Sequence, residues 1–250
     1  SRRRFPAGKE PMGPTKPSRR DIKARLLGHL RKGNPVEGLT EFSTLPRTRL
    51  VNALFSFLLS TQPMVKWSAV AAMGAVTAQI AQTDMESARV VMRRLMWQLN
   101  DESGGIGWGC PEAMGEIMAR HTRLAEEYGK ILISYAGEEM NYLEYAPLQQ
   151  GVVWAIGRVA QVHSDLMVPA VPHLIVHLDA PVPALRGLAA WALAYLPAPE
   201  ATSRLRALLI DTATVPVYQN GALADRRICD LAREALPGIG PFADSGPAPV

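Results

Sequence analysis

The sequence predicts an all-α fold, an α-solenoid of about five helix pairs with an N-terminal capping helix. The main observation is a nine-residue register that occurs five times along the chain. Each copy has alanine in one column, a large apolar residue directly after it, and another large apolar residue three positions later. The copies are anchored at residues 74, 115, 157, 194 and 237, which are 41, 42, 37 and 43 positions apart. Self-similarity at about 40 residues, combined with helical periodicity, indicates stacked helix pairs.

The register places its small and apolar residues on one face of a helix. In the first copy the spacing i, i+3, i+4, i+7 is occupied by Ala69, Ala72, Met73 and Val76. The alanine, with the glycine or alanine two residues later in four of the copies, is expected to let the first helix of the pair approach closely, while the large apolar residue fills the gap between repeats. We therefore assign these columns to packing and not to chemistry.

The first 44 residues divide into a tail and a capping helix. Residues 1–20 are rich in Pro, Gly and Arg and poor in large apolar side chains, so we expect a disordered basic tail. In the region 21–44, Asp21 is a candidate N-cap of a helix that runs to about Lys32. Its apolar face is expected to cover the open edge of the first repeat.

Five helix pairs are expected within residues 45–239. The first helix of each pair is predicted at 47–59, 85–99, 124–135, 166–178 and 203–211. The second is predicted at 63–82, 110–121, 148–163, 182–196 and 222–236. Pro169 and Pro172 predict a kink or a late start in the fourth of the first helices. Residues 240–250 are expected to form a second disordered tail.

The charge of the chain is unevenly distributed. The net charge is +4, but residues 1–32 alone carry eleven Lys or Arg against two acidic residues, and the remainder has a net charge of −5. A nucleic-acid groove along the repeats would need a basic stripe, so contact with nucleic acid is expected only through residues 1–32. No apolar run approaches the roughly 18 residues of a membrane span, and no membrane partner is expected.

Cysteine usage favours a reducing compartment. The two cysteines, Cys110 and Cys229, lie in different repeats and lack metal-ligand spacing. The basic N-terminus has no apolar core of a secretion signal, so we expect a cytoplasmic protein. The column of Cys110 holds alanine or valine in the other copies, which favours a small residue that faces the core.

The alanine-centred register resembles HEAT-type repeats of the armadillo-type fold, including the short variety of phycobilin-lyase-like proteins. The resemblance covers roughly residues 45–239. Residues 92–109 also resemble a segment from a family of bacterial HEAT-repeat proteins to which no activity is attached. HEAT-like proteins mostly act as scaffolds or adaptors, so the resemblance implies a protein partner more than an enzyme.

Two enzyme families with this fold require specific residues in the sequence. Deoxyhypusine hydroxylases carry His-Glu dipeptides that ligate iron, but the five histidines here are followed by Leu, Thr, Ser, Leu and Leu. HEAT-like alkyl-base DNA glycosylases need a cationic concave face with aromatic residues and a catalytic carboxylate. The acidic body counts against that branch, although four tryptophans keep it open: Trp67, Trp108, Trp154 and Trp191. We expect no catalytic residues, no metal and no cofactor.

The connections within the helix pairs and the concave face of the second helices are the expected binding surface. In a solenoid these connections all lie along one edge. The longest are 136–147 and 211–224, and acidic and aromatic residues gather along this edge. Such a mixture suits a cationic or amphipathic protein partner, with aromatic anchors contributing most of the affinity. The predicted contacts are Asp101, Glu102, Trp108, Glu112, Tyr142 and Tyr145.

The glycine-rich connection 100–109 leaves alternatives open. Its four glycines permit positive φ, and it leads into a helix N-terminus, which is typical of an anion site. An accessory lyase or ligand-binding protein would hold a small anionic or tetrapyrrole ligand near residues 100–112. The structural alternative packs Trp108 between repeats, because Trp67 occupies the same column. Glu112 and Glu116 either chelate a cation or lie on an exposed face, where Glu116 pairs with Arg120.

Overall fold

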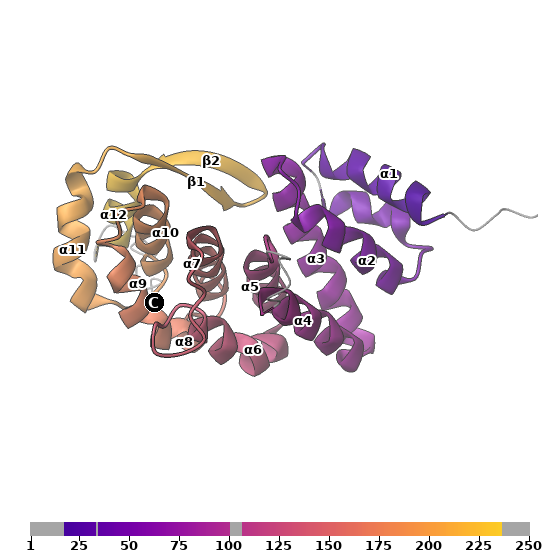
Figure 1. The fold of residues 1–250 in the computed structure, drawn as a ribbon, viewed down its shortest axis with the longest axis horizontal. Helices are drawn as coiled ribbons and strands as arrows, with labels where there is room; N and C mark the ends of the chain where they lie inside the picture. The colour runs from indigo at the N-terminus through magenta and orange to yellow at the C-terminus, as the bar shows by residue number, and fades with distance from the viewer. Residues whose placement is uncertain (1–17, 34, 101–106, 237–250) are drawn as a thin grey trace, which may run out of the picture.

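The computed structural model describes residues 18–33, 35–100 and 107–236, and these form an elongated row of stacked helices (Figure 1). The predicted all-α solenoid is confirmed. We call the first helix of each pair an A helix and the second a B helix. No helix in the described ranges combines the length and the hydropathy needed to cross a bilayer.

The capping helix α1 (Arg19–Leu30) begins earlier than predicted, because its N-cap is Ser18 and not Asp21. The Ser18 hydroxyl accepts a hydrogen bond from the Asp21 amide at 3.1 Å, and the Asp21 carboxylate accepts one from the Ser18 amide at 3.0 Å. This reciprocal capping box satisfies two amides of the first turn. Residues Arg19 and Arg20, assigned to the tail by the sequence, are therefore helical, whereas residues 1–17 lie outside the described ranges. A 3-10 helix, η1 (Glu37–Phe42), follows.

The first three A helices are α2 (Arg47–Leu58), α4 (Met85–Leu99) and α6 (Thr122–Ser134). The fourth is broken into three pieces, α8 (Ser164–Met167), η2 (Val168–Ala170) and α9 (Val171–His177). The fifth consists of the short 3-10 helix η3 (Pro199–Ala201), α11 (Thr202–Ala207) and η4 (Leu208–Ile210). The B helices are α3 (Pro63–Thr83), α5 (Cys110–Arg120), α7 (Ala146–Ala160), α10 (Pro183–Leu193) and α12 (Ile228–Ala235). The break at Pro169 and Pro172 is as predicted, because proline lacks the amide that would continue the helix. Four B helices carry proline in their first turn, where no amide donor is needed: Pro63, Pro111, Pro147 and Pro183.

The alanine column forms the contact between successive B helices. Ala72, Ala113, Ala155 and Ala192 are fully buried, and Ala235 is partly buried. A Cβ atom added at Gly115 would lie 2.6 Å from the Cβ of Ala155, so the backbones of α5 and α7 approach each other closely. The register is a packing face, as predicted, but the close approach at its small residues is between successive B helices and not between the A and B helices of one pair.

The fifth repeat departs from the prediction, because residues 222–227 form a strand and not the start of a helix. Strands β1 (Thr214–Gln219) and β2 (Ala222–Arg227) pair antiparallel, with Gln219 opposite Ala222. The two-residue turn is Asn220–Gly221, with φ of 52° and 81°. Asn-Gly is the strongest sequence signal for a tight hairpin turn, since both positions require positive φ.

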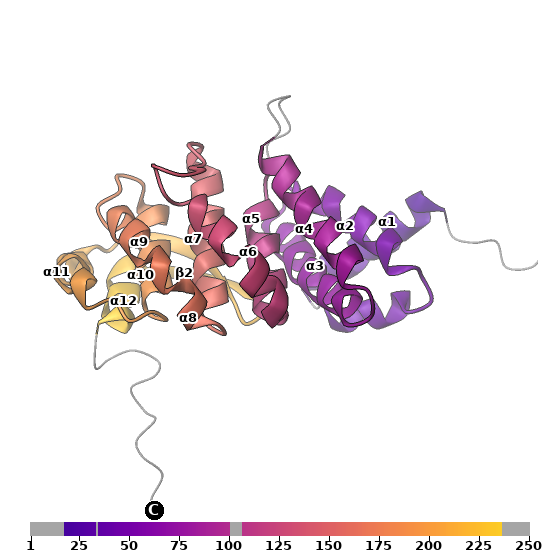
Figure 2. The same ribbon diagram turned by 90° about the horizontal axis from the view of Figure 1, so that it is seen from below.

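The hairpin lies across the B helices and away from the A helices. Figure 1 shows it extending from α12 and α10 along one side of the row toward α3. The turned view in Figure 2 also places it alongside α10 and α7. A face that an open solenoid would expose is thus covered by a segment of the same chain.

Candidate functional site

An aromatic cluster joins the hairpin to the B helices. Trp67 of α3 stacks on Tyr218 of β1, with ring centroids 4.8 Å apart, and lies 4.7 Å from Trp154 of α7. Trp154 in turn stacks with Trp191 of α10 at 6.2 Å. Trp154 and Trp191 directly precede the alanine of their register copies, so the repeat itself places them side by side.

Hydrogen bonds fix the hairpin onto this cluster. The Trp154 indole donates to the backbone carbonyl of Tyr218 at 2.9 Å, and both groups are buried. The Gln219 side chain accepts a 3.4 Å hydrogen bond from the Trp191 indole and donates to the Tyr195 hydroxyl at 2.7 Å. Burial raises the pKa of the Tyr218 phenol. The hairpin is therefore an integral part of the fold, held by specific polar contacts in an apolar surrounding.

A pocket of about 430 Å³ lies between the N-terminal ends of the B helices and the hairpin. This volume falls within the range of roughly 300–1,000 Å³ that is typical of ligand-binding pockets. We call it the aromatic pocket, and the side chains that define it are Lys66, Trp67, Trp108, Glu112, Tyr145 and Pro216. They come from three repeats and from β1, so the stacking of the repeats creates the pocket.

The structure brings together three of the six residues predicted as contacts. Trp108, Glu112 and Tyr145 all line the aromatic pocket. Trp108 is 37% exposed and Tyr145 is 46% exposed, so both rings are accessible to a partner. Trp67, which shares the column of Trp108, is instead packed against the aromatic cluster.

The other three predicted residues are placed differently. Tyr142 does not line the pocket but lies in the neighbouring connection between α6 and α7. Burial raises the pKa of its phenol, and the charges of Glu138 and Glu144 raise it further. Asp101 and Glu102 fall outside the described residues.

Two close approaches of the backbone set the position of Trp108. Gly109 has a φ of +76°, and a Cβ atom there would lie 2.8 Å from the carbonyl oxygen of Leu58. A Cβ atom at Gly107 would lie 2.8 Å from the carbonyl oxygen of Gln98. A residue with a side chain would clash at either position, so glycine is required at both. The backbone can therefore pack closely against α2 and α4, which places Trp108 just before α5.

Glu112 is buried, which contradicts its interpretation as part of an exposed face. Its carboxylate is only 4% exposed and forms a 2.6 Å ion pair with Lys66 of α3. Gly151 of α7 leaves the space, because a Cβ atom there would lie 2.6 Å from the carboxylate. The position in the first turn of α5 also favours a negative charge. The ion pair neutralises the floor of the aromatic pocket.

Glu116 is the centre of a second ion-pair cluster, next to the hairpin turn. The predicted pair with Arg120 is confirmed at 2.6 Å, but it is not a surface pair, because Glu116 is 4% exposed and also binds Arg158 at 2.7 Å. These groups line a pocket of about 350 Å³ together with the hairpin turn. In the described ranges, no three potential metal ligands are grouped closely enough to hold an ion.

Cys110 is the cysteine nearest to the aromatic pocket. Its side chain is fully buried, as its column predicted, and neither cysteine is paired in a disulfide. Burial raises the pKa of the Cys110 thiol to about 12, and the charge of Glu112 contributes to the increase. The thiol is therefore protonated at neutral pH and has little nucleophilic character.

Comparisons with known proteins find a matching family model and similar solved structures. A family model described as a HEAT-like repeat matches residues 146–196, which span α7 to α10. A crystal structure of an engineered protein is similar over 88% of this chain and 96% of its own, with 18% identity and a TM-score of 0.50. Computationally designed armadillo repeat proteins for modular peptide recognition match over 86% of this chain and 98% of theirs, with 17% identity and a TM-score of 0.48. No curated protein matches the chain.

The repeated register, the helix pairs and the matched segment define the class of the protein, an α-solenoid of HEAT-like repeats. The fold and the repeat type that the sequence predicted are thereby confirmed. This chain differs from a bare row of repeats in one respect, because its own hairpin covers the B helices.

Proposed function

We propose that the protein is a scaffold or adaptor that binds another protein at the aromatic pocket. The observation that carries the proposal is the pair Trp108 and Tyr145, two accessible aromatic rings that flank a neutral, mostly apolar pocket. Aromatic residues that project beside a concave apolar site supply most of the binding energy in many protein interfaces. An inserted apolar side chain of the partner would contact both rings.

The charges around the pocket suggest the chemistry of the partner. Glu138, Glu139 and Glu144 are exposed in the connection that precedes α7, next to Tyr145. No carboxylate on the pocket floor is free, since Glu112 is neutralised by Lys66. An amphipathic segment with basic residues fits this arrangement, because its apolar side chains enter the pocket while its charges face the acidic rim. Asp101 and Glu102 are proposed to extend the same rim.

The hairpin restricts where the partner binds. The Trp154 and Trp191 rings, which an open solenoid would present on the B-helix face, are buried beneath it. The proposed site is therefore the edge formed by the connections within the helix pairs, and not the whole concave face. The ligand-binding alternative near residues 100–112 stays a prediction, because residues 101–106 lie outside the described ranges.

The proposal is tested by capture from native cell extract on the immobilised full chain, followed by mass spectrometry. The double variant Trp108→Ala/Tyr145→Ala should lose the captured partner and keep its melting temperature, since both rings are accessible. Trp97→Ala is the matched control, because Trp97 is 75% exposed on α4 and lies outside the pocket. Charge reversal at Asp101 and Glu102 should weaken capture as well. Equal capture by the double variant and the wild type would remove the aromatic pocket from the binding site.

A further inference from the structure

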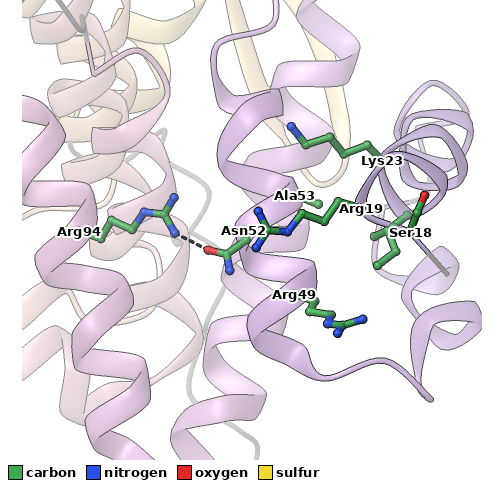
Figure 3. Close-up of a pocket in the computed structure, with 8 residues that line it drawn as sticks. Ser18, Arg19, Lys23, Arg49, Asn52, Ala53 and Arg94 are labelled. Carbon is green, nitrogen blue, oxygen red and sulfur yellow. Dashed lines mark hydrogen bonds between the residues drawn. The ribbon is translucent and has the colours of Figure 1, made fainter. Parts of the chain in front are cut away.

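A second cleft, of about 620 Å³, lies at the N-terminal end of the solenoid and shares no lining residue with the aromatic pocket. Helices α1, α2 and α4 form its walls, and Figure 3 shows the side chains that line it. We call it the basic cleft, because four of its lining residues are cationic: Arg19, Lys23, Arg49 and Arg94. The remaining lining residues are small, polar or apolar, and none is acidic.

None of the four cations is neutralised by an ion pair with another described residue. Within the described part of the chain, Arg19, Lys23 and Arg49 form no ion pair and no side-chain hydrogen bond. Neighbouring arginines on the same helices are paired, since Arg25 binds Glu41 at 2.7 Å and Arg93 binds Glu86. The cleft therefore concentrates positive charge that the fold itself does not compensate.

Arg94 is held in place for binding. Its guanidinium donates a hydrogen bond to the Asn52 side chain, drawn as a dashed line in Figure 3, and lies 3.9 Å from the centroid of the Phe55 ring. Stacking on a ring and one hydrogen bond fix the plane of the guanidinium while leaving further N–H groups free. A fixed guanidinium loses little conformational entropy when it binds an oxyanion.

The acidic residue closest in sequence to the cleft lining, Asp21, is already engaged. Asp21 follows the lining residue Ser18 in the first turn of α1, and its carboxylate accepts hydrogen bonds from the Ser18 amide and hydroxyl. This capping role holds it at the helix N-terminus, and it does not line the cleft. Among the described residues, the lining of the cleft thus contains no carboxylate that would compete with an external anion.

We propose that the basic cleft binds a ligand that carries two or more phosphate groups. Arginine presents its N–H groups in a fork that matches phosphate oxygens, and three of the four cations are arginines. The cations come from three different helices, and a ligand with several phosphates offers a separate oxyanion group to each of them. Polyphosphate and the phosphodiester backbone of a nucleic acid share this chemistry, and the test distinguishes them.

The test is isothermal titration of the full chain with sodium tripolyphosphate at low salt. The site variant is Lys23→Glu/Arg49→Glu, and the control variant is Lys130→Glu/Arg206→Glu. All four positions are exposed, and the two double variants change the net charge equally. The site variant should bind at least about tenfold more weakly, because two charge-assisted contacts are replaced by repulsion, while the control should retain its affinity.

Three results would overturn the proposal: no heat of binding for the wild type, an equal loss in both variants, or polyglutamate binding as tightly as tripolyphosphate. Circular dichroism of both variants checks that they are folded. A parallel titration with an oligothymidylate identifies the source of the phosphates. If its affinity also falls selectively in the site variant, the cleft accepts a phosphodiester backbone. If its affinity falls equally in both variants, or if it does not bind, the cleft is specific for polyphosphate.

Discussion

Replacing Gly115 by alanine places a methyl group at a close approach of α5 to α7. The new Cβ atom would lie 2.6 Å from the Ala155 Cβ, 2.7 Å from its Cα and 3.0 Å from its carbonyl oxygen. These partners are the backbone and the first side-chain carbon, so no rotamer change can relieve the contact. The two helices must separate.

The expected magnitude follows from two opposing terms. Overpacking of a well-packed core costs about 1–3 kcal/mol, and the rigid partners place this site near the upper end. Alanine has a higher helix propensity than glycine, which returns about 1 kcal/mol. The net effect is a destabilisation of about 2 kcal/mol, which corresponds to a melting temperature lower by roughly 4–8 °C in a protein of this size.

The chain provides a matched control for this prediction. Gly28 lies within α1, and a Cβ atom there would meet nothing within 4 Å. Gly28→Ala therefore retains only the propensity term and should raise stability by up to about 1 kcal/mol. Urea denaturation followed by circular dichroism measures both variants. A Gly115→Ala protein as stable as Gly28→Ala would refute the close packing of the alanine column.

Three further substitutions probe the hairpin and the buried polar groups. Trp154→Phe removes the donor to the Tyr218 carbonyl, so hydrogen exchange of the β1 amides should accelerate and stability should fall by about 1–3 kcal/mol; unchanged protection would mean that this bond does not hold the hairpin. Glu116→Gln removes the charge that two arginines share and should cost about 2 kcal/mol in urea denaturation, whereas a stabilised protein would contradict the ion-pair argument. In a Cys229→Ser background, Cys110 should react with a thiol reagent at pH 8 roughly a thousandfold more slowly than a thiol of pKa 9.0, because a pKa of about 12 leaves far less thiolate. The reaction rate should rise with pH. Rapid labelling of the native protein at pH 8 would show that the thiol is accessible and ionised.

The helix pairs could be predicted because their signal is local and repeated. Alanine followed by large apolar residues at helical spacing predicts both a helix and the face that the helix buries. Four of the five B helices begin within two residues of the predicted position. The break at Pro169 was predictable for the same reason, since proline acts on its own helix. These features need no knowledge of distant residues.

The hairpin was missed although its strongest signal, Asn220–Gly221, is present in the sequence. Residues 222–227 contain alanine, leucine and arginine, which favour helix, and they extend the register of the fifth copy. What makes them a strand is pairing with β1, and what holds β1 is the row of tryptophans from other repeats. Tertiary contacts outweighed local propensity here.

The candidate sites were only partly predictable, because each is assembled from several repeats. Trp108 and Tyr145 could be selected as aromatic residues on the expected edge, and the structure places them around one pocket. The burial of Glu112 depends on Lys66 and Gly151 in the two neighbouring repeats, which spacing along one helix does not reveal. The basic cleft similarly joins α1 to α4 across two intervening helices.

The contact between Tyr218 and Trp67 has a mechanical consequence. In a solenoid in which each repeat contacts only its neighbours, the superhelix can bend and extend, and the terminal repeats unfold most easily. Here β1 of the last repeat contacts α3, the B helix of the first repeat, so the first and last repeats are linked directly. Changes of superhelical pitch would have to break this contact, so we expect the hairpin to restrain the curvature of the solenoid.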